Sequence, residues 1–125
     1  MIQDKDYIMR LVHEIARMLI RMIFNRDIDR EGELPVAEEL LERYQKYMAM
    51  IDDGQINEAE NRLLDEMDLR DPAYFEMVLR FYEKLGSKSE EFLEEHDYTQ
   101  DEVLDGMKYV VDCYGYGDLW DPVSR

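Results

Sequence analysis

The chain has 125 residues, of which 46% are hydrophobic and 37% charged, and this balance predicts one globular domain with an apolar core and excludes a disordered polymer. Its 31 acidic residues outnumber 15 basic ones, and the resulting net charge of −16 argues against nucleic acids and anionic membranes as partners. The single cysteine cannot form an internal disulfide, and the N-terminus lacks the apolar run of a signal peptide. No stretch reaches the roughly 20 apolar residues of a membrane span. We therefore expect a cytoplasmic protein.

A long first helix is predicted from residue 4 to about residue 26, because this stretch holds no glycine or proline and has acids in its first turn and arginines toward its end. On a helical wheel its apolar side chains cover an arc of roughly 220°, about twice that of an ordinary surface helix. We expect neighbouring helices to leave part of this arc uncovered, which predicts a homodimer contact through the helix. The candidate interface residues lie at the edges of the arc: Tyr7 and Met18 at one edge, Ala16 and Ile20 at the other, with Phe24 beyond them.

The first helix also differs from the rest of the chain in charge. Residues 1–30 hold six bases and five acids, whereas residues 31–125 hold nine bases and 26 acids. Arg10, Arg17 and Arg21 share one stripe of the helix with Glu14 between them. This stripe is interpreted either as a solvent-exposed face with ion pairs along it or as a basic strip that docks on an acidic surface. For the second interpretation, an acidic surface of this same protein is favoured over one of a different partner.

A second helix is predicted from Pro35 to about Ile51 and a third from Ile56 to near Asp68, separated by a turn at Gly54. Residues 40–70 resemble part of a tetratricopeptide-type repeat, in which a small alanine lets two helices pack closely. The residues that carry the resemblance are Gly54, Ile56, Glu58, Ala59 and Leu63, whereas Glu66 stands where the repeat has a small residue. The resemblance implies a helical hairpin.

Three further helices complete the predicted domain. One runs from Pro72 to Leu85, and the pairs Ser87 with Glu90 and Thr99 with Glu102 are spaced as capping boxes for a short fifth helix and a sixth helix. The sixth helix is expected to stop at Gly115, which divides the chain into a domain of residues 1–115 and a C-terminal tail of residues 116–125. The tail holds Trp120, which either packs back on the domain or docks on another subunit.

We expect no catalytic residue, cofactor or metal. His13 and His96 lack a second ligand at helical spacing, and Cys113 has the character of an inert, partly buried thiol. The acid-rich segment 90–97 is interpreted as a solvated face, with an enzyme built on such a carboxylate cluster as an alternative. No glycine-rich loop leads from a strand into a helix, so nucleotide binding has no support.

The opening segment Asp6-Tyr7-Ile8-Met9-Arg10 and the long apolar helix that follows are similar to a family of short proteins from Gram-positive anaerobic bacteria, classed only as a domain of unknown function. The resemblance covers about the first 25 residues well and implies a bacterial, cytoplasmic, helical protein without an assigned activity. It implies no functional residues.

Together these observations predict an all-α fold, a compact array of five to six helices in which the long N-terminal helix packs on tetratricopeptide-like hairpins. The favoured function is a protein–protein interaction module, because helical hairpins create concave surfaces and the chain is rich in tyrosine and methionine. Two alternatives stay open: an enzyme that uses a carboxylate cluster, and an acidic decoy that occupies the nucleic-acid-binding site of another protein.

Overall fold

The computed structural model describes residues 7–26 and 35–118, and every regular element within those ranges is helical. In chain order the elements are α1 (Tyr7–Phe24), the 3-10 turn η1 (Glu38–Leu40), α2 (Leu41–Asp52), α3 (Ile56–Asp65), α4 (Pro72–Leu85), α5 (Glu90–Glu95) and α6 (Gln100–Cys113). The prediction of an all-α array is therefore confirmed.

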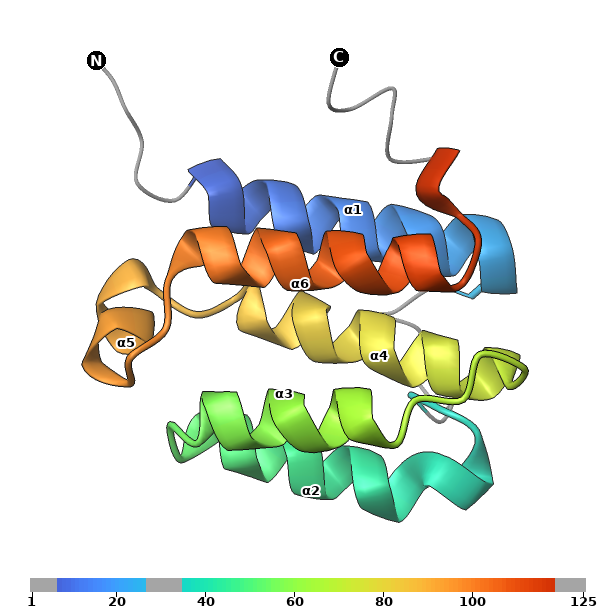
Figure 1. Ribbon diagram of the computed structural model, residues 1–125, viewed down its shortest axis with the longest axis horizontal. Helices are drawn as coiled ribbons and strands as arrows, with labels where there is room; N and C mark the ends of the chain where they lie inside the picture. The colour runs from blue at the N-terminus through green and yellow to red at the C-terminus, as the bar shows by residue number, and fades with distance from the viewer. Residues whose placement is uncertain (1–6, 27–34, 119–125) are drawn as a thin grey trace.

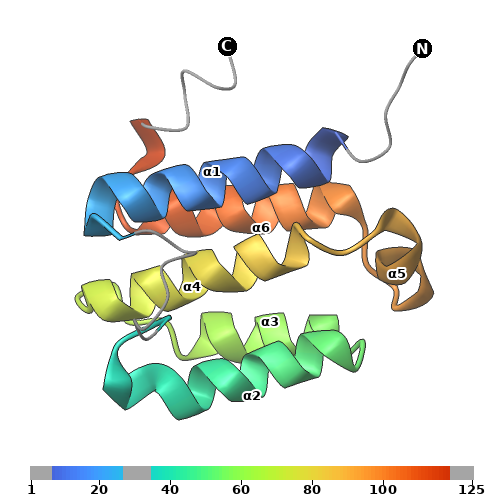
Figure 2. The same ribbon diagram turned by 180° about the vertical axis from the view of Figure 1, so that it is seen from behind.

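Helix α4 forms the centre of the array (Figure 1). Helices α1 and α6 lie side by side along one of its sides, α2 and α3 lie along the other, and α5 lies at one end, as the reverse view also shows (Figure 2). Ten of the 14 residues of α4 are buried, including the polar Glu76 and Arg80. The apolar core is thus built around α4, and α1 packs mainly on α4 and α6.

Two helices begin where local sequence signals predict them to begin. At the start of α4, Pro72 occupies the first turn and the Asp71 carboxylate accepts a hydrogen bond of 3.0 Å from the amide of Ala73. At the start of α6, the amide of Glu102 donates to Thr99 Oγ1 at 3.1 Å and the amide of Thr99 donates to Glu102 Oε1 at 2.8 Å. The capping box predicted for α6 is therefore confirmed.

The second helix begins later than predicted. Pro35 and Val36 lie in a bend, Ala37 is extended, and the chain becomes helical only at η1 before α2 begins at Leu41. Val36 is fully buried, and η1 packs on α4. The chain must first bring this valine into the core, so tertiary packing delays the helix that Pro35 alone would favour.

The predicted cap of α5 is also wrong. The residue that caps this helix is Ser89, whose Oγ accepts a hydrogen bond of 3.0 Å from the amide of Phe92. The hydroxyl of Ser87 instead donates to the carbonyl of Lys84 at 2.6 Å, which extends the end of α4. Only Ser87 has a glutamate three residues later, yet either serine hydroxyl can cap a helix, so the path of the chain after α4 decides which one caps α5.

The turn between α2 and α3 depends on a glycine. Gly54 has a φ of +87°, which favours glycine, and a Cβ at this position would overlap the ring of His96 from the end of α5. Helix α3 then ends at Asp65, earlier than the predicted end near Asp68, because the amide of Met67 donates to the carbonyl of Leu64 in a tighter turn.

After α6 the chain folds back onto α4. The rings of Tyr114 and Tyr116 lie parallel to the ring of Phe75, with centroids 4.3 and 5.4 Å away, and the hydroxyl of Tyr114 donates to the carbonyl of Asp68 at 2.8 Å. Stacked aromatic rings of this kind stabilise a packed end of the core. The segment just beyond Gly115 therefore packs on the domain.

Candidate functional site

Exposed hydrophobic side chains gather on one side of α1. Within the described ranges five large hydrophobic side chains are exposed, and three of them belong to α1: Tyr7 at 58%, Met18 at 39% and Met22 at 56%. Met18 follows Tyr7 by eleven residues, or about three helical turns, and Met22 follows Met18 by four residues, or about one turn. These three side chains therefore lie on a single strip of the helix. We call Tyr7, Met18 and Met22 the outer strip of α1.

One of the two predicted edges of the first helix forms this strip. Tyr7 and Met18 are exposed as predicted, whereas Met22, which the candidate residues did not include, joins them one turn after Met18. The helical spacing of four residues was the signal that could have identified it.

The prediction that the other edge of the arc lies outside the core is wrong. Ala16 and Ile20 are fully buried, and Phe24 packs edge to face on Phe75, with ring centroids 6.0 Å apart. The central helix α4 covers this side of α1, because its buried face is wide enough to contact α1 along its length. The remaining candidate, Trp120, lies outside the described residues.

The three arginines of α1 separate into two groups. Arg17 is half-buried, and its Nη1 lies 3.9 Å from Glu83 Oε2, which also lies 3.1 Å from Nδ1 of His13. These contacts join α1 to α4. Arg10 and Arg21 are exposed beside the outer strip together with Glu14, so this side of α1 has a net positive charge.

The neighbouring helix α6 carries the opposite charge. Its exposed acids are Asp101, Glu102, Asp105 and Asp112, and its single base is Lys108, whereas α1 carries three arginines and one glutamate. Tyr109, which is 56% exposed, lies on the same face of α6 as Asp105 and Asp112 at helical spacing. Helices α1 and α6 lie side by side (Figure 1). The apolar, basic strip of α1 therefore has an aromatic, acidic strip on the neighbouring helix.

A polar cluster inside the domain is centred on Glu60 of α3. Its Oε2 accepts a hydrogen bond of 2.6 Å from the hydroxyl of Tyr82, and its Oε1 accepts one of 2.7 Å from the hydroxyl of Tyr98. Burial, and then the neighbouring Glu60 carboxylate, raise the pKa of both tyrosines well above the usual value of about 10. Both carboxylate oxygens are thus occupied by neutral hydroxyls, so the cluster ties helices together and does not offer a free acid or base.

A second polar cluster lies on the side of α4 that faces α1 and α2. The side chains of Glu76 and Arg80 are almost completely buried, with Arg80 Nη2 at 3.4 Å from Glu76 Oε2. Arg26 Nε lies 3.0 Å from the same oxygen. Burial is also the main cause of the raised pKa of Tyr44, which lies near Arg80 and Glu83. The contact between Arg26 and Glu76 joins the segment just after α1 to α4.

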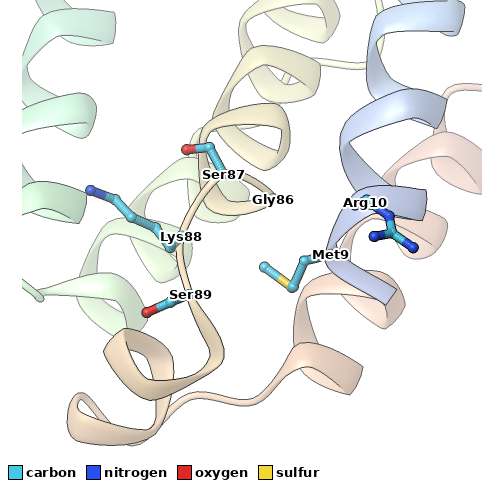
Figure 3. A pocket seen from close by; sticks show the side chains of 6 residues that line it. All are labelled: Met9, Arg10, Gly86, Ser87, Lys88 and Ser89. Atoms are coloured by element: carbon cyan, nitrogen blue, oxygen red, sulfur yellow. The ribbon is translucent and has the colours of Figure 1, made fainter. Parts of the chain in front are cut away.

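A hollow of about 320 Å³ lies between the start of α1 and the turn after α4 (Figure 3). Its lining residues are Met9, Arg10, Gly86, Ser87, Lys88 and Ser89. Figure 3 shows Arg10 and Lys88 pointing to opposite sides, and Nζ of Lys88 lies 2.7 Å from Asp52 Oδ1. Both serine hydroxyls make the main-chain hydrogen bonds of the α4–α5 turn. The polar groups of the hollow therefore do not converge on a common ligand position.

The side chains that the sequence analysis considered as catalytic or metal-binding candidates near α5 are held in structural contacts or exposed to solvent. Nδ1 of His96 lies 2.7 Å from the carbonyl of Phe92, and its ring tilts against the Phe92 ring. Most carboxylates of segment 90–97 point into solvent around α5. In the part of the chain that the structure describes, no three His, Cys, Asp or Glu side chains are grouped so that they could hold a metal ion.

No helix among residues 7–26 and 35–118 is long and apolar enough to cross a lipid bilayer. No curated protein and no solved structure significantly matches the chain. A family model does match it, over residues 1–115 of the 125. The chain therefore belongs to the Family of unknown function (DUF6483).

Proposed function

We propose that this protein is a protein–protein interaction module and that the outer strip of α1 is its docking surface. The observation that carries the proposal is the exposure of Tyr7, Met18 and Met22 on one strip, whereas most other large apolar side chains among the described residues are buried. Fully burying a methionine side chain contributes about 1.5–3 kcal/mol, so a partner that covers the strip gains appreciable free energy. Tyrosine, methionine and arginine are also the side chains enriched at protein interfaces.

The flanking charges indicate the chemistry of the partner. Arg10 and Arg21 border the strip, so a partner with apolar side chains bordered by carboxylates is complementary to it. The cytoplasm of a bacterium, as the opening residues imply, is the proposed setting. The α2–α3 hairpin, in which Ala59 is fully buried, is the proposed tetratricopeptide-like part of the module.

Site-specific photo-crosslinking tests the proposal. A benzophenone amino acid is placed at Met18 in one variant and, as a control, at the exposed Gln45 of α2 in another, and each is irradiated in cells of the source organism. We expect discrete adducts from position 18 that are absent from position 45. Arg21→Glu should abolish these adducts, whereas the matched change Lys46→Glu on α2 should leave them intact. Adducts that are absent, or equal from both positions, would refute the proposal.

A further inference from the structure

We propose that the partner of the outer strip is a second copy of this chain, in a two-fold dimer in which α1 of each copy lies on α6 of the other. This inference rests on the proposed function, because it takes the outer strip as a docking surface. It adds the identity of the partner and the surface that the strip meets.

Charge complementarity between the two helices supports this arrangement. On the exposed side of α1, Arg10 and Arg21 accompany Glu14, whereas α6 has four exposed acids and one lysine. Packing α1 against α1 of a second copy would bring arginines close to arginines. Packing α1 against α6 instead brings Arg10 and Arg21 close to Asp105 and Asp112 of the second copy.

The position of the two helices allows both contacts to form at once. Helices α1 and α6 lie side by side on the same side of α4 (Figures 1 and 2). Each of them also has buried residues that belong to the shared core. A two-fold axis parallel to these helices places α1 over the partner's α6 and α6 over the partner's α1. The same residue pairs then occur twice, and the assembly closes as a dimer without leaving a free copy of either surface.

Apolar contacts accompany the ion pairs. Tyr109 is exposed on α6 between Asp105 and Asp112. Its aromatic ring is available to the methionines of the outer strip, and methionine packs well against aromatic rings. Both faces of the proposed contact therefore combine apolar side chains with opposite charges.

A charge-exchange experiment tests the arrangement, with sedimentation velocity of the purified full chain at tens of micromolar and low salt. We expect the unmodified protein to be a dimer and both Arg21→Glu and Asp112→Lys, which change the two partners of one proposed contact, to weaken it by roughly tenfold or more, because each creates two like-charge contacts. An equimolar mixture of the two variants should recover the dimer. In a dimer with one copy of each variant, one of the two symmetric ion pairs is unchanged, and the other joins the introduced glutamate to the introduced lysine. Circular dichroism confirms that each variant is folded, and Lys46→Glu on α2 is the matched control that leaves the dimer unchanged.

The possible outcomes separate the two proposals. A monomeric unmodified protein overturns the dimer, while the interaction module survives if position 18 still crosslinks to a different protein. A dimer that responds to Arg21→Glu but not to Asp112→Lys, and that the mixture does not recover, overturns the pairing of α1 with α6. A dimer that neither variant affects refutes the inference and removes the outer strip from the interface.

Discussion

At the scale of single residues, Glu60 is the polar centre that joins three parts of the chain. It lies on α3, and its two tyrosine partners come from α4 and from the turn before α6. Gly106 of α6 makes the close approach possible, because a Cβ there would lie 2.6 Å from Glu60 Oε2 and 2.7 Å from the Tyr82 hydroxyl. A residue without a side chain is therefore required in the middle of α6, where glycine is otherwise unfavourable.

This requirement reverses the usual effect of a glycine-to-alanine change in a helix. Such a change normally stabilises a helix by about 0.5–1 kcal/mol. We expect Gly106→Ala to lower the free energy of unfolding by about 1–2 kcal/mol instead. The added methyl group would overlap the buried Tyr82 side chain and would disrupt the hydrogen bond from its hydroxyl to Glu60. Urea denaturation followed by circular dichroism measures the change.

The Tyr82→Phe background provides the control for this prediction. Removing the hydroxyl relieves part of the overlap, so Gly106→Ala should cost less in that background than in the unmodified chain. An alanine variant that is as stable as the unmodified protein would show that α6 does not approach Glu60 so closely.

At the scale of elements, α3 and α4 carry two ion pairs with the same spacing in different surroundings. Arg62 and Glu58 are paired on the outside of α3, with exposed fractions of 48% and 54%. Arg80 and Glu76 are paired inside the array on α4, with exposed fractions of 6% and 7%. Solvent screens the first pair and not the second, so burial decides what each pair contributes.

We therefore expect different losses from the same substitution on the two helices. Glu76→Gln should lower the free energy of unfolding by about 3 kcal/mol or more, because it leaves the buried guanidinium of Arg80 without its charge partner. The matched Glu58→Gln should cost less than about 0.5 kcal/mol. Thermal denaturation of both variants checks the difference, and equal losses would contradict the assignment of Glu76 and Arg80 to the core.

The two sides of α1 give a second contrast between elements. Ile20 is fully buried against the core, whereas Met18 lies on the outer strip. We expect Ile20→Glu to destabilise the fold by about 3 kcal/mol or more, since it buries an unpaired carboxylate, and Met18→Glu to change the stability of the monomer by less than about 0.5 kcal/mol, at a protein concentration too low for the dimer. Melting curves by circular dichroism provide the measurement. Similar melting temperatures for the two variants would mean that α1 is not covered by α4 on the side of Ile20.

At the scale of the whole molecule, buried tyrosine hydroxyls link helices across the array. Tyr74 donates to the carbonyl of Leu63 at 2.5 Å, and Tyr82 and Tyr98 donate to Glu60. Burial is the first cause that raises the pKa of each of these tyrosines well above the usual value, and burial also raises the pKa of Tyr114 to about 12. The folded state therefore holds protons that the unfolded chain releases above about pH 10.

The sign of this difference predicts a loss of stability in alkali. Stability from these groups is fully present below about pH 10, the unfolded pKa of tyrosine, and falls as the pH rises toward the higher folded-state values. Urea titrations at neutral pH and at pH values above about 10 measure the fall. Tyr98→Phe removes one such group and should make the decline shallower. An unfolding free energy that is constant into this alkaline range would contradict the burial of these hydroxyls.

Much of the fold follows from local signals in the sequence. The Asp71-Pro72 pair and the Thr99–Glu102 box start α4 and α6 at the predicted positions, because the capping hydrogen bonds join residues only two or three positions apart. The glycine turn between α2 and α3 is local in the same sense. The wide arc of apolar side chains on the first helix is likewise visible in the sequence, and two neighbours, α4 and α6, pack on it.

Only the tertiary structure decided which parts of that arc are covered. Periodicity shows which side chains of a helix are apolar, but the neighbour that covers each one comes from elsewhere in the chain. Ala16 and Ile20 became core because α4 packs on them, and Met22 remained outside because no described helix covers it. The hydrogen bonds of Glu60 could not be predicted from the sequence, because they join residues that are far apart along the chain. The Arg80–Glu76 pair has an ordinary helical spacing, but its burial depends on the helices that pack around α4.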